Sequence, residues 1–228
     1  MAKVDVYCHK SEQVKGHGKG NGGHPRYRCY SCYKVFQLEY TYQACKPSVK
    51  EQIVDIAMNN GGVRNTARIL KVATATVMKT FKKLTPRHVT TLPLEGKNIQ
   101  LICEIDEQWS FVGNKQNQRW LWYAWEPRLK RIVSHVFGDR GRNTLDKLLA
   151  LLSPFNIRFY CTDNYAAYNN LPEEKHLPGK TFTQRIERTN LTHRTRIKRL
   201  NRKTIGYSKS VEMHDKVIGT FIEREHYF

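Results

Sequence analysis

The chain has 228 residues, of which 39% are hydrophobic and 11% aromatic, a composition that excludes a largely disordered protein and suits one or two globular domains. Its 39 basic and 20 acidic side chains give a net charge of +19, which favours a polyanionic partner such as nucleic acid. No apolar run is long enough to span a membrane, and MAKVDVYCHK lacks the apolar core of a signal peptide, so we expect a cytoplasmic protein without a membrane partner.

Composition and periodicity divide the chain into four segments. Residues 1–42 are rich in Gly, Cys, His and Tyr, and residues 46–84 have helical periodicity. Residues 85–98, TPRHVTTLPLEGKN, contain two prolines and a glycine, as linkers do, and residues 99–228 alternate strand-like and helix-like stretches. We predict a zinc-ribbon-like finger, a helix-turn-helix domain, a linker and an α/β domain, in that order.

The first segment has the cysteine spacing of an incomplete zinc site. Cys29 and Cys32 in CYSC are spaced to bind one Zn²⁺ ion, and Cys8 is the only cysteine upstream of them. Structural zinc has four ligands, so one more is needed. The candidates for that ligand are Asp5, His9, His17 and His24. Zinc binding is the prediction that we favour, and a degenerate finger without metal is the alternative.

The second segment predicts helices separated by tight turns. SVKEQIVDIAMNN ends at GGV, RNTARILKV forms a second short helix, and TATVMKTFKKL forms a third with Thr74 as its N-cap. Two short helices joined by a turn are typical of a helix-turn-helix, whose second helix enters the major groove of DNA. A helical hairpin that only packs is the alternative. The predicted DNA contacts are Thr74, Thr76, Lys79, Lys82 and Lys83.

The last segment predicts a mixed β-sheet with flanking helices. Three aromatic and β-branched strands joined by hairpins are followed by a helix, a fourth strand, a short helical stretch and a long basic helix. The order of three strands, helix, strand and helix predicts an α/β fold of ribonuclease-H-like architecture. The predicted ranges are 100–113, 118–126, 130–138, 143–152, 157–163, 164–170 and 182–200.

Two aspartates lie at the ends of predicted strands, where this residue type is unusual. Asp106 lies near the end of the first strand and Asp163 closes the fourth. If these strands are adjacent and parallel, both carboxylates reach one edge of the sheet, and Glu187 can approach from the long helix. Three converging carboxylates repel one another unless divalent cations lie between them, and hard oxygen ligands select Mg²⁺ or Mn²⁺. Two such ions support displacement at a phosphodiester.

Glu187 is the single acid in the basic stretch TQRIERTNLTHRTRIKRL, residues 183–200. On a helix, Glu187, Asn190 and Arg194 share a stripe, so the carboxylate can reach metal while Arg194 binds a DNA phosphate. The face expected to pack on the sheet consists of Phe182, Ile186, His193, Ile197 and Leu200. The basic residues expected to extend the phosphate contacts are Arg188, Arg196, Lys198 and Arg199.

Each of the three acids also has a simpler explanation. The alternatives are a turn at Asp163 in DNY, an ion pair of Asp106 with Arg119, and an ion pair of Glu187 with Arg188 or Arg194. Glu104 lies on the same strand face as Asp106 and is the main rival ligand. Glu107 is expected to point to the other face.

Together these motifs resemble the DDE transposases of the insertion-sequence-one family over nearly the whole chain. The resemblance is carried by RYRCYSCYKVFQLEYTY, QIVDIAMNNGGVRNTARIL, EIDEQWSFVG, QRWLWYAW, SHVFGDR, LLSPFNIRFYCTD, TQRIERTNL and SKSVEMHDKVIG. It implies that Asp106, Asp163 and Glu187 form the DDE triad, with 23 residues between the last two, and that Arg194 matches the basic residue that follows the glutamate. The family's finger usually begins with CxxC, whereas VDVYCHKSE has only Cys8.

The resemblance implies a DNA transposase of the bacterial cytoplasm, associated with the nucleoid. Such an enzyme binds the terminal inverted repeats of its element, cuts at the 3′ ends with water, and joins the freed 3′-OH to target DNA. Pairing two DNA ends implies at least a homodimer on DNA. Two alternatives stay open: a ribonuclease-H-like nuclease that cuts without joining, and a DNA-binding repressor whose carboxy-terminal domain is inactive.

Overall fold

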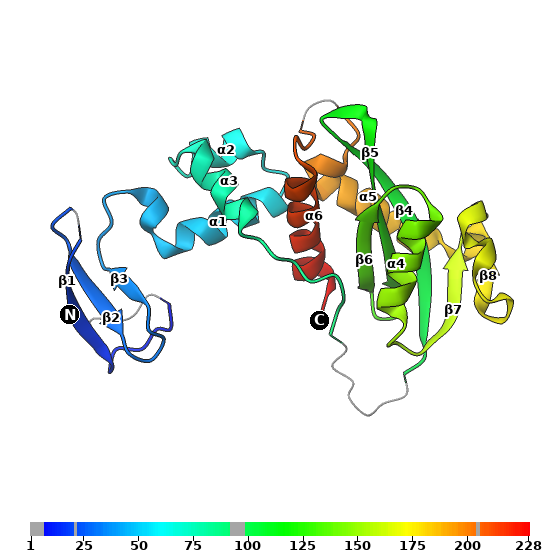
Figure 1. Cartoon of the computed structure of the whole chain (residues 1–228), viewed down its shortest axis with the longest axis horizontal. Coiled ribbons are helices and arrows are strands. Elements are labelled where there is room, and N and C mark those ends of the chain that lie inside the picture. The colour runs from blue at the N-terminus through cyan, green and yellow to red at the C-terminus, as the bar shows by residue number, and fades with distance from the viewer. Residues whose placement is uncertain (1–6, 21, 92–98, 204–205) are drawn as a thin grey trace. The chain divides into compact units, whose positions relative to one another are not determined.

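A computed structural model describes residues 7–20, 22–91, 99–203 and 206–228 (Figure 1). The chain forms two compact units, one of Met1–Ile56 with Val63–Thr80 and the other of Ala57–Gly62 with Phe81–Phe228. No helix in the described ranges combines the length and the apolar character that crossing a bilayer requires.

The first unit begins with a small antiparallel sheet. Strands β1 (Val14–Lys19), β2 (Pro25–Cys29) and β3 (Val35–Gln37) pair in the order β1-β2-β3. Tyr27, Cys29 and Phe36 form its core, with Cys8 and Cys32 packed against them. A core of this size buries little apolar surface, so a sheet this small needs a further source of stability such as a bound metal.

Three helices follow, as the sequence predicts. They are α1 (Pro47–Met58), α2 (Val63–Ile69) and α3 (Thr74–Lys82), preceded by a 3₁₀ turn, η1 (Gln43–Cys45). Val77 and Phe81 are fully buried, as expected from their helical spacing. The prediction of Thr74 as N-cap is wrong by one position, because the carbonyl of Ala73 accepts the amide hydrogens of Thr76 and Val77 and Thr74 is the first helical residue.

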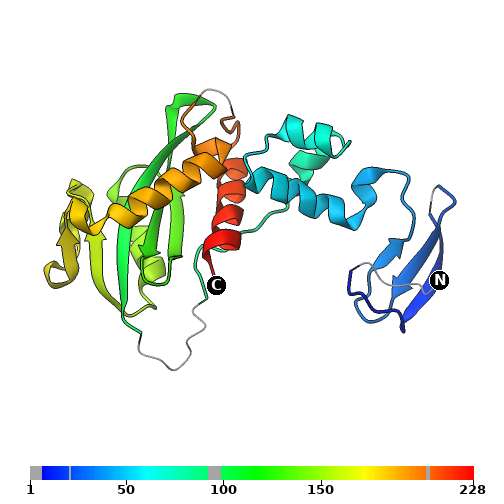
Figure 2. The ribbon, with the colours of Figure 1, turned by 180° about the vertical axis from the view of Figure 1, so that it is seen from behind.

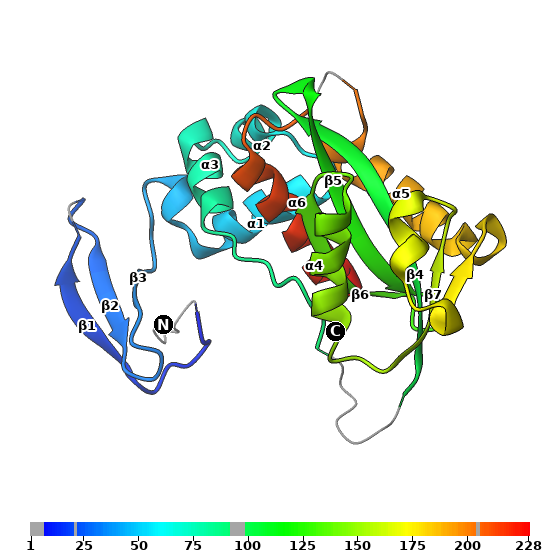
Figure 3. The same ribbon diagram turned by 45° about the vertical axis from the view of Figure 1, so that its right-hand side comes forward.

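The second unit contains a five-stranded mixed sheet. The strands β4 (Leu101–Val112), β5 (Asn114–Glu126) and β6 (Arg131–Gly138) form an antiparallel meander. Strand β7 (Ile157–Thr162) runs parallel to β4, and a short strand that the sequence did not predict, β8 (His176–Pro178), runs parallel to β7 (Figure 3). The strand order is β6-β5-β4-β7-β8, which confirms an α/β fold with a mixed sheet.

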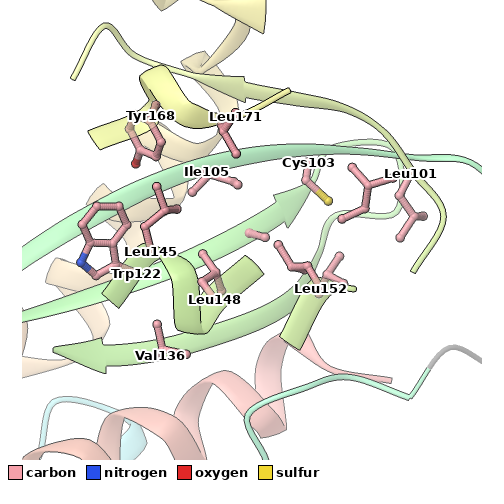
Figure 4. Packing of buried hydrophobic residues seen from close by; sticks show 13 residues of the cluster. Leu101, Cys103, Ile105, Trp122, Val136, Leu145, Leu148, Leu152, Tyr168 and Leu171 are labelled. Atoms are coloured by element: carbon pink, nitrogen blue, oxygen red, sulfur yellow. The ribbon is translucent and has the colours of Figure 1, made fainter. Parts of the chain in front are cut away.

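Helices cover both faces of this sheet. Helix α4 (Arg142–Leu152) lies on one face, and α5 (Gln184–Arg196) and α6 (Val211–His226) lie on the other (Figures 1 and 2). Alternate residues of β4 divide between the faces, because successive side chains of a strand point in opposite directions. The core under α4 includes Leu101, Cys103, Ile105, Trp122, Leu145, Leu148 and Leu152 (Figure 4).

The long basic helix is shorter than the sequence predicted. Residues 182–200 contain the end of a 3₁₀ turn, η4 (Lys180–Phe182), then α5, then a second turn, η5 (Lys198–Leu200). Ile197 has extended backbone angles and ends α5. Ile186, His193, Ile197 and Leu200 are buried as predicted, but Phe182 is 46% exposed because it precedes the helix and does not follow its periodicity. The remaining short turns are η2 (Ala166–Asn170) and η3 (Glu173–Lys175).

Part of the predicted linker is built into the sheet. The amide of Thr90 donates to the carbonyl of Val133 at 2.9 Å, and the amide of His135 donates to the carbonyl of His88 at 3.0 Å. This pairing satisfies backbone groups on the free edge of β6. The rest of the predicted linker, residues 92–98, lies outside the described residues.

Candidate active site

The parallel pairing of β4 with β7 brings two of the predicted acids together, although Asp106 lies in the middle of β4 and not near its end as predicted, because β4 continues to Val112. Cys103 pairs with Tyr160 and Glu104 with Cys161, and β7 ends at Thr162. The pairs end there, and an extension of this register by two residues would set Asp106 beside Asp163, about 5 Å away. Both aspartates line the same cavity, which has a volume of about 510 Å³.

Glu187 lies on the helix that contacts Asp106. The side-chain amide of Asn190, one turn further along α5, donates a hydrogen bond to Oδ2 of Asp106. Residues three positions apart on a helix are neighbours, with Cβ atoms about 5–6 Å apart. Glu187 itself is exposed and is not among the residues that line the cavity of the two aspartates. It forms no ion pair within the described part of the chain.

Asp106 lies in an environment that disfavours its charge. Burial, followed by the nearby charge of Glu107, raises the pKa of Asp106 from 3.8 to about 7, and the charge of Asp163 acts in the same direction. Hydrogen bonds from the backbone amide of Glu107, at 2.8 Å, and from Asn190 oppose this rise. Acidic side chains are therefore concentrated around Asp106.

This raised pKa predicts a loss of stability as pH rises. Between pH 4 and 7, folded Asp106 holds a proton that the unfolded chain has released, so the free energy of unfolding falls across this window. Asn at this position cannot titrate. Urea unfolding of metal-free protein at pH 5 and pH 7.5 should show a larger loss for the wild type than for Asp106→Asn. Equal losses in the two proteins would contradict the assignment.

Arg194 lies close to the same carboxylate. Burial and the charge of Arg202 lower the pKa of the Arg194 guanidinium, whereas the charge of Asp106 opposes that effect. Arg194 is partly exposed, two turns along α5 from Glu187, in the stripe that the sequence predicted. A cation held here can bind a phosphate that approaches Asp106.

A buried hydrogen-bond network stands behind Asp106. The hydroxyl of Tyr123 donates to Oδ1 of Asn190 at 2.9 Å, which turns the NH₂ group of that amide toward Asp106. The amide of Gln108 donates to the backbone carbonyl of Asn190 at 3.0 Å, and the Gln108 carbonyl lies 3.3 Å from Nδ1 of His193. Burial holds the pKa of His193 well below its ordinary value, so this ring is neutral at neutral pH.

Glu104, the rival ligand, and its neighbour Glu107 both have structural partners. Oε2 of Glu104 accepts the backbone N–H of Ile186 at 2.7 Å and thereby fixes the start of α5. Glu107 points to the other face, as predicted, but it also lines the cavity. It accepts hydrogen bonds there from Arg140 at 2.9 Å and from the hydroxyl of Tyr168 at 2.7 Å.

The structure also bears on the simpler explanations. Arg119 pairs with Asp215 at 2.6 Å, so the alternative pair of Asp106 with Arg119 does not form. Asp163 does begin a turn, because its Oδ1 accepts the backbone N–H of Tyr165 at 2.9 Å. Asp163 also lines the cavity, so a turn at this residue does not exclude a role in the site.

Comparison with known proteins identifies the family. The family model described as IS1 transposase matches residues 100–228, which is more than half of the chain. This chain belongs to the IS1 transposase family. The family model described as the InsA C-terminal domain, a helix-turn-helix model, matches residues 40–84.

Individual relatives agree with this membership. The insertion element iso-IS1n protein InsB of Shigella dysenteriae is 57% identical over 129 residues, which cover 56% of this chain and 98% of that protein. The insertion element IS1 4 protein InsB of Escherichia coli K12 is 47% identical over 148 residues, which cover 64% of this chain and 89% of that protein. A simian T-cell lymphotropic virus intasome in complex with the PP2A regulatory subunit B56 gamma aligns over 71% of this chain and 63% of that one. The sequence identity to that chain is 13% and the TM-score is 0.39.

In this IS1-family chain, the predicted DNA contacts of the helix-turn-helix lie on accessible positions. Thr74, Lys79, Lys82 and Lys83 are exposed. Thr76 is partly exposed, and its hydroxyl lies 3.3 Å from that of Tyr42, with which it shares a hydrogen bond.

The predicted phosphate contacts after Glu187 divide into two groups. Arg188 is exposed and Lys198 partly exposed. Arg196 instead pairs with Glu225. Arg199 donates to the hydroxyl of Ser208 at 2.8 Å, and burial lowers its pKa to about 10. For Arg196 and Arg199 the structure therefore shows protein contacts in place of an open phosphate-binding position.

The finger gathers the three cysteines that the sequence singled out. The sulfur atoms of Cys8, Cys29 and Cys32 lie within 4.8 Å of one another. None of the candidate histidines His9, His17 and His24 joins them within the described ranges, and Asp5 lies outside those ranges. His24 instead shares a hydrogen bond with Thr41 at 2.9 Å.

Proposed function

We propose that this IS1-family protein is a DNA transposase that binds the terminal inverted repeats of its element, cuts the 3′ ends and joins them to target DNA. The observation that carries the proposal is the pair Asp106 and Asp163, which line one cavity beside the helix that bears Glu187. Hydrolysis and joining are both displacements at phosphorus, so one site serves both steps.

The topology of the sheet supports a ribonuclease-H-like architecture. In chain order, the strands lie as third, second, first, fourth and fifth, and only the second runs antiparallel to the rest. In this arrangement β7 ends beside the middle of β4, so that Asp163, directly after β7, comes near Asp106 within β4.

The carboxylate oxygens around this cavity are suitable ligands for a pair of divalent cations. Carboxylates are the ligands that Mg²⁺ and Mn²⁺ prefer, and a bound cation would offset the burial and the charges of Glu107 and Asp163 that raise the pKa of Asp106. We propose Asp106, Asp163 and Glu187 as the ligands. When bound, two Mg²⁺ or Mn²⁺ ions would activate the attacking oxygen and stabilise the leaving oxygen.

The protein's own side chains have distinct roles in this proposal. Asn190 and the amide of Glu107 hold the two oxygens of Asp106, and the amide of Tyr165 holds one oxygen of Asp163. Arg194 binds a non-reacting phosphate oxygen and so orients the DNA strand. The exposed face of α3 docks on the DNA ends and selects them. Two ends must be held together for joining, so we propose a homodimer or larger assembly on DNA, at the bacterial nucleoid.

A joining assay separates the proposed activity from its rivals. Full-length protein is incubated with Mg²⁺, pre-cut duplexes of its element ends and supercoiled target plasmid. Covalent joining of end to target is expected. A nuclease of the same fold would nick the plasmid without joining, and a repressor would retard the end duplex on a gel without either product.

A second prediction concerns the finger, which we propose binds zinc through Cys8, Cys29 and Cys32. Purified protein should contain about one equivalent of zinc, as a structural site does. Cys29→Ser or Cys32→Ser should lose the metal, because removing a thiolate leaves too few ligands. Cys45→Ser is the matched control, since Cys45 is exposed and outside the cluster. Elemental analysis that finds no zinc in wild-type protein would identify a degenerate finger.

A further inference from the structure

The cavity beside the two aspartates has an aromatic wall that the proposed chemistry does not use. Trp109 on β4 and Trp120 on β5 are direct cross-strand partners, so their rings lie on the same face of the sheet. Both are partly exposed and both line the cavity. Trp120 pairs with Gly138, the last residue of β6, and α4 begins only at Arg142, so the helix starts after the residue that pairs with Trp120.

Hydrogen-bond donors and positive charge surround these rings. The guanidinium of Arg140 lies 5.0 Å from the ring centre of Trp120 and 4.2 Å from that of Tyr165, and that of Arg202 lies 5.6 Å from Trp109. Gln118 receives the indole N–H of Trp120 at 3.1 Å, which leaves its own amide hydrogens to donate. The indole nitrogen of Trp109 is buried and has no hydrogen-bond partner among the described residues.

Glu107 fixes one side of this wall. It lies on the same face of β4 as Trp109 and accepts hydrogen bonds from Arg140 and from Tyr168. Arg140 is thus held in place between two aromatic rings, while its charge stays at the mouth of the cavity. A side chain braced in this way is pre-organised to contact a ligand at low entropic cost.

We propose that this tryptophan pocket, formed by Trp109, Gln118, Trp120, Arg140 and Arg202, receives one unpaired nucleobase of the DNA strand that is cut at Asp106 and Asp163. The inference rests on the proposed function, because it places the base next to the reacting phosphate. Aromatic side chains stack on any base through its π-face, and arginine adds a cation–π contact. A base paired within a duplex cannot lie on the ring, so the nucleotide must be unstacked from its neighbours.

The chemistry of the wall favours a base over an apolar side chain from another protein copy. An apolar group would displace water from the amide of Gln118 and from the guanidinium groups of Arg140 and Arg202 without offering them acceptors, which is unfavourable. A base has nitrogen and carbonyl acceptors along its edge, and its flanking phosphates match Arg140 and Arg202. The neighbouring carboxylates disfavour an acidic peptide.

A double-mutant cycle, which combines a substitution in the protein with a missing base in the DNA, tests the pocket. End duplexes carry a single abasic site at each position flanking the cleavage point, and their joining rates are measured with wild-type protein and with Trp120→Ala. At one position, the ratio of intact to abasic rates should be about tenfold larger for wild-type protein than for Trp120→Ala, because only wild-type protein stacks the missing base. Trp120→Phe should retain the coupling.

Control variants separate stacking from general damage. Arg158→Ala removes an exposed arginine that lies 5.4 Å from the ring of Phe159, at the other end of β7, and should leave the abasic ratio unchanged. Thermal unfolding reports the stability of each variant, and Trp120→Leu replaces Trp120→Ala if the latter does not fold. If the intact-to-abasic rate ratios of wild-type protein and Trp120→Ala differ by less than about twofold at every position, the proposed base-binding pocket is wrong. The proposal is also wrong if Trp120→Ala loses self-association and the two rate ratios do not differ, because the tryptophans would then contact a second copy of the protein.

A binding measurement keeps this inference distinguishable from the proposed function. Anisotropy titrations of the same duplexes use Asp106→Asn protein with and without the Trp120→Ala change. The same coupling of about tenfold is expected, since stacking does not require cleavage. An active Asp106→Asn variant would refute the proposed function, whereas normal cleavage without coupling in either assay would refute the pocket alone.

Discussion

Asp106→Asn, Asp163→Asn and Glu187→Gln are each expected to reduce cleavage and joining by about a thousandfold or more, because a metal centre that loses a carboxylate loses several kcal/mol of transition-state stabilisation. Binding to the element ends should persist, since we propose that the exposed face of α3 binds them. The measurement is the rate of joining of pre-cut ends in Mg²⁺, with a gel-shift assay for end binding.

The controls for these variants are other acids of the same unit. Asp146 on α4 is exposed and pairs with Arg142 at 3.7 Å, so Asp146→Asn should have wild-type activity. Glu104→Gln keeps an oxygen to accept the N–H of Ile186, and it should reduce activity far less than Glu187→Gln. If the order of those two effects were reversed, Glu104 would be the third ligand and the assignment of Glu187 would be wrong.

Asn190→Ala is expected to slow joining by about 10- to 100-fold, the usual effect of removing a group that orients a metal ligand. It should also lower the free energy of unfolding by about 1–3 kcal/mol, because the hydroxyl of Tyr123 and one oxygen of Asp106 lose a buried partner. Joining rates and urea unfolding provide the two measurements.

Two further variants separate orientation from packing at this position. Asn190→Asp has nearly the same volume but sets a second carboxylate against Asp106, so it should be less stable at pH 8 than Asn190→Ala. Thr192→Ala removes an exposed hydroxyl that donates to the carbonyl of Arg188 on the same helix, and it should change neither rate nor stability. Wild-type joining by Asn190→Ala would show that Asp106 needs no such support.

The sequence predicted the strands and the positions of the acids because local patterns determine them. Asp106 stands out because aspartate is depleted in strands. Asp163 directly follows β7, and the parallel pairing of β7 with β4 brings the two residues to one cavity. The stripe that links Asn190 and Arg194 also follows from helical periodicity alone. The sequence gives no comparable signal for how far Glu187 extends from its helix toward the aspartates.

Contacts that depend on pairing between distant elements were not predicted. Gly113, at a φ of +79°, makes a tight turn that starts β5 at Asn114, four residues before the expected strand, and this register pairs Trp109 with Trp120. Burial of His193 against Gln108 likewise requires α5 to be docked on the sheet. A polar residue at every second position of β4 from Glu104 to Ser110 was the available signal for a buried polar face.

The central claim is that the carboxylates of Asp106, Asp163 and Glu187 together bind the catalytic cations. The most direct measurement is a crystal structure of the protein on its element ends with Mn²⁺, in which anomalous scattering locates the ions. Two peaks are expected beside the carboxylate oxygens of all three residues, at ligand distances of about 2.1 Å. Peaks that leave Glu187 outside this range, or that lie on other side chains, would contradict the claim.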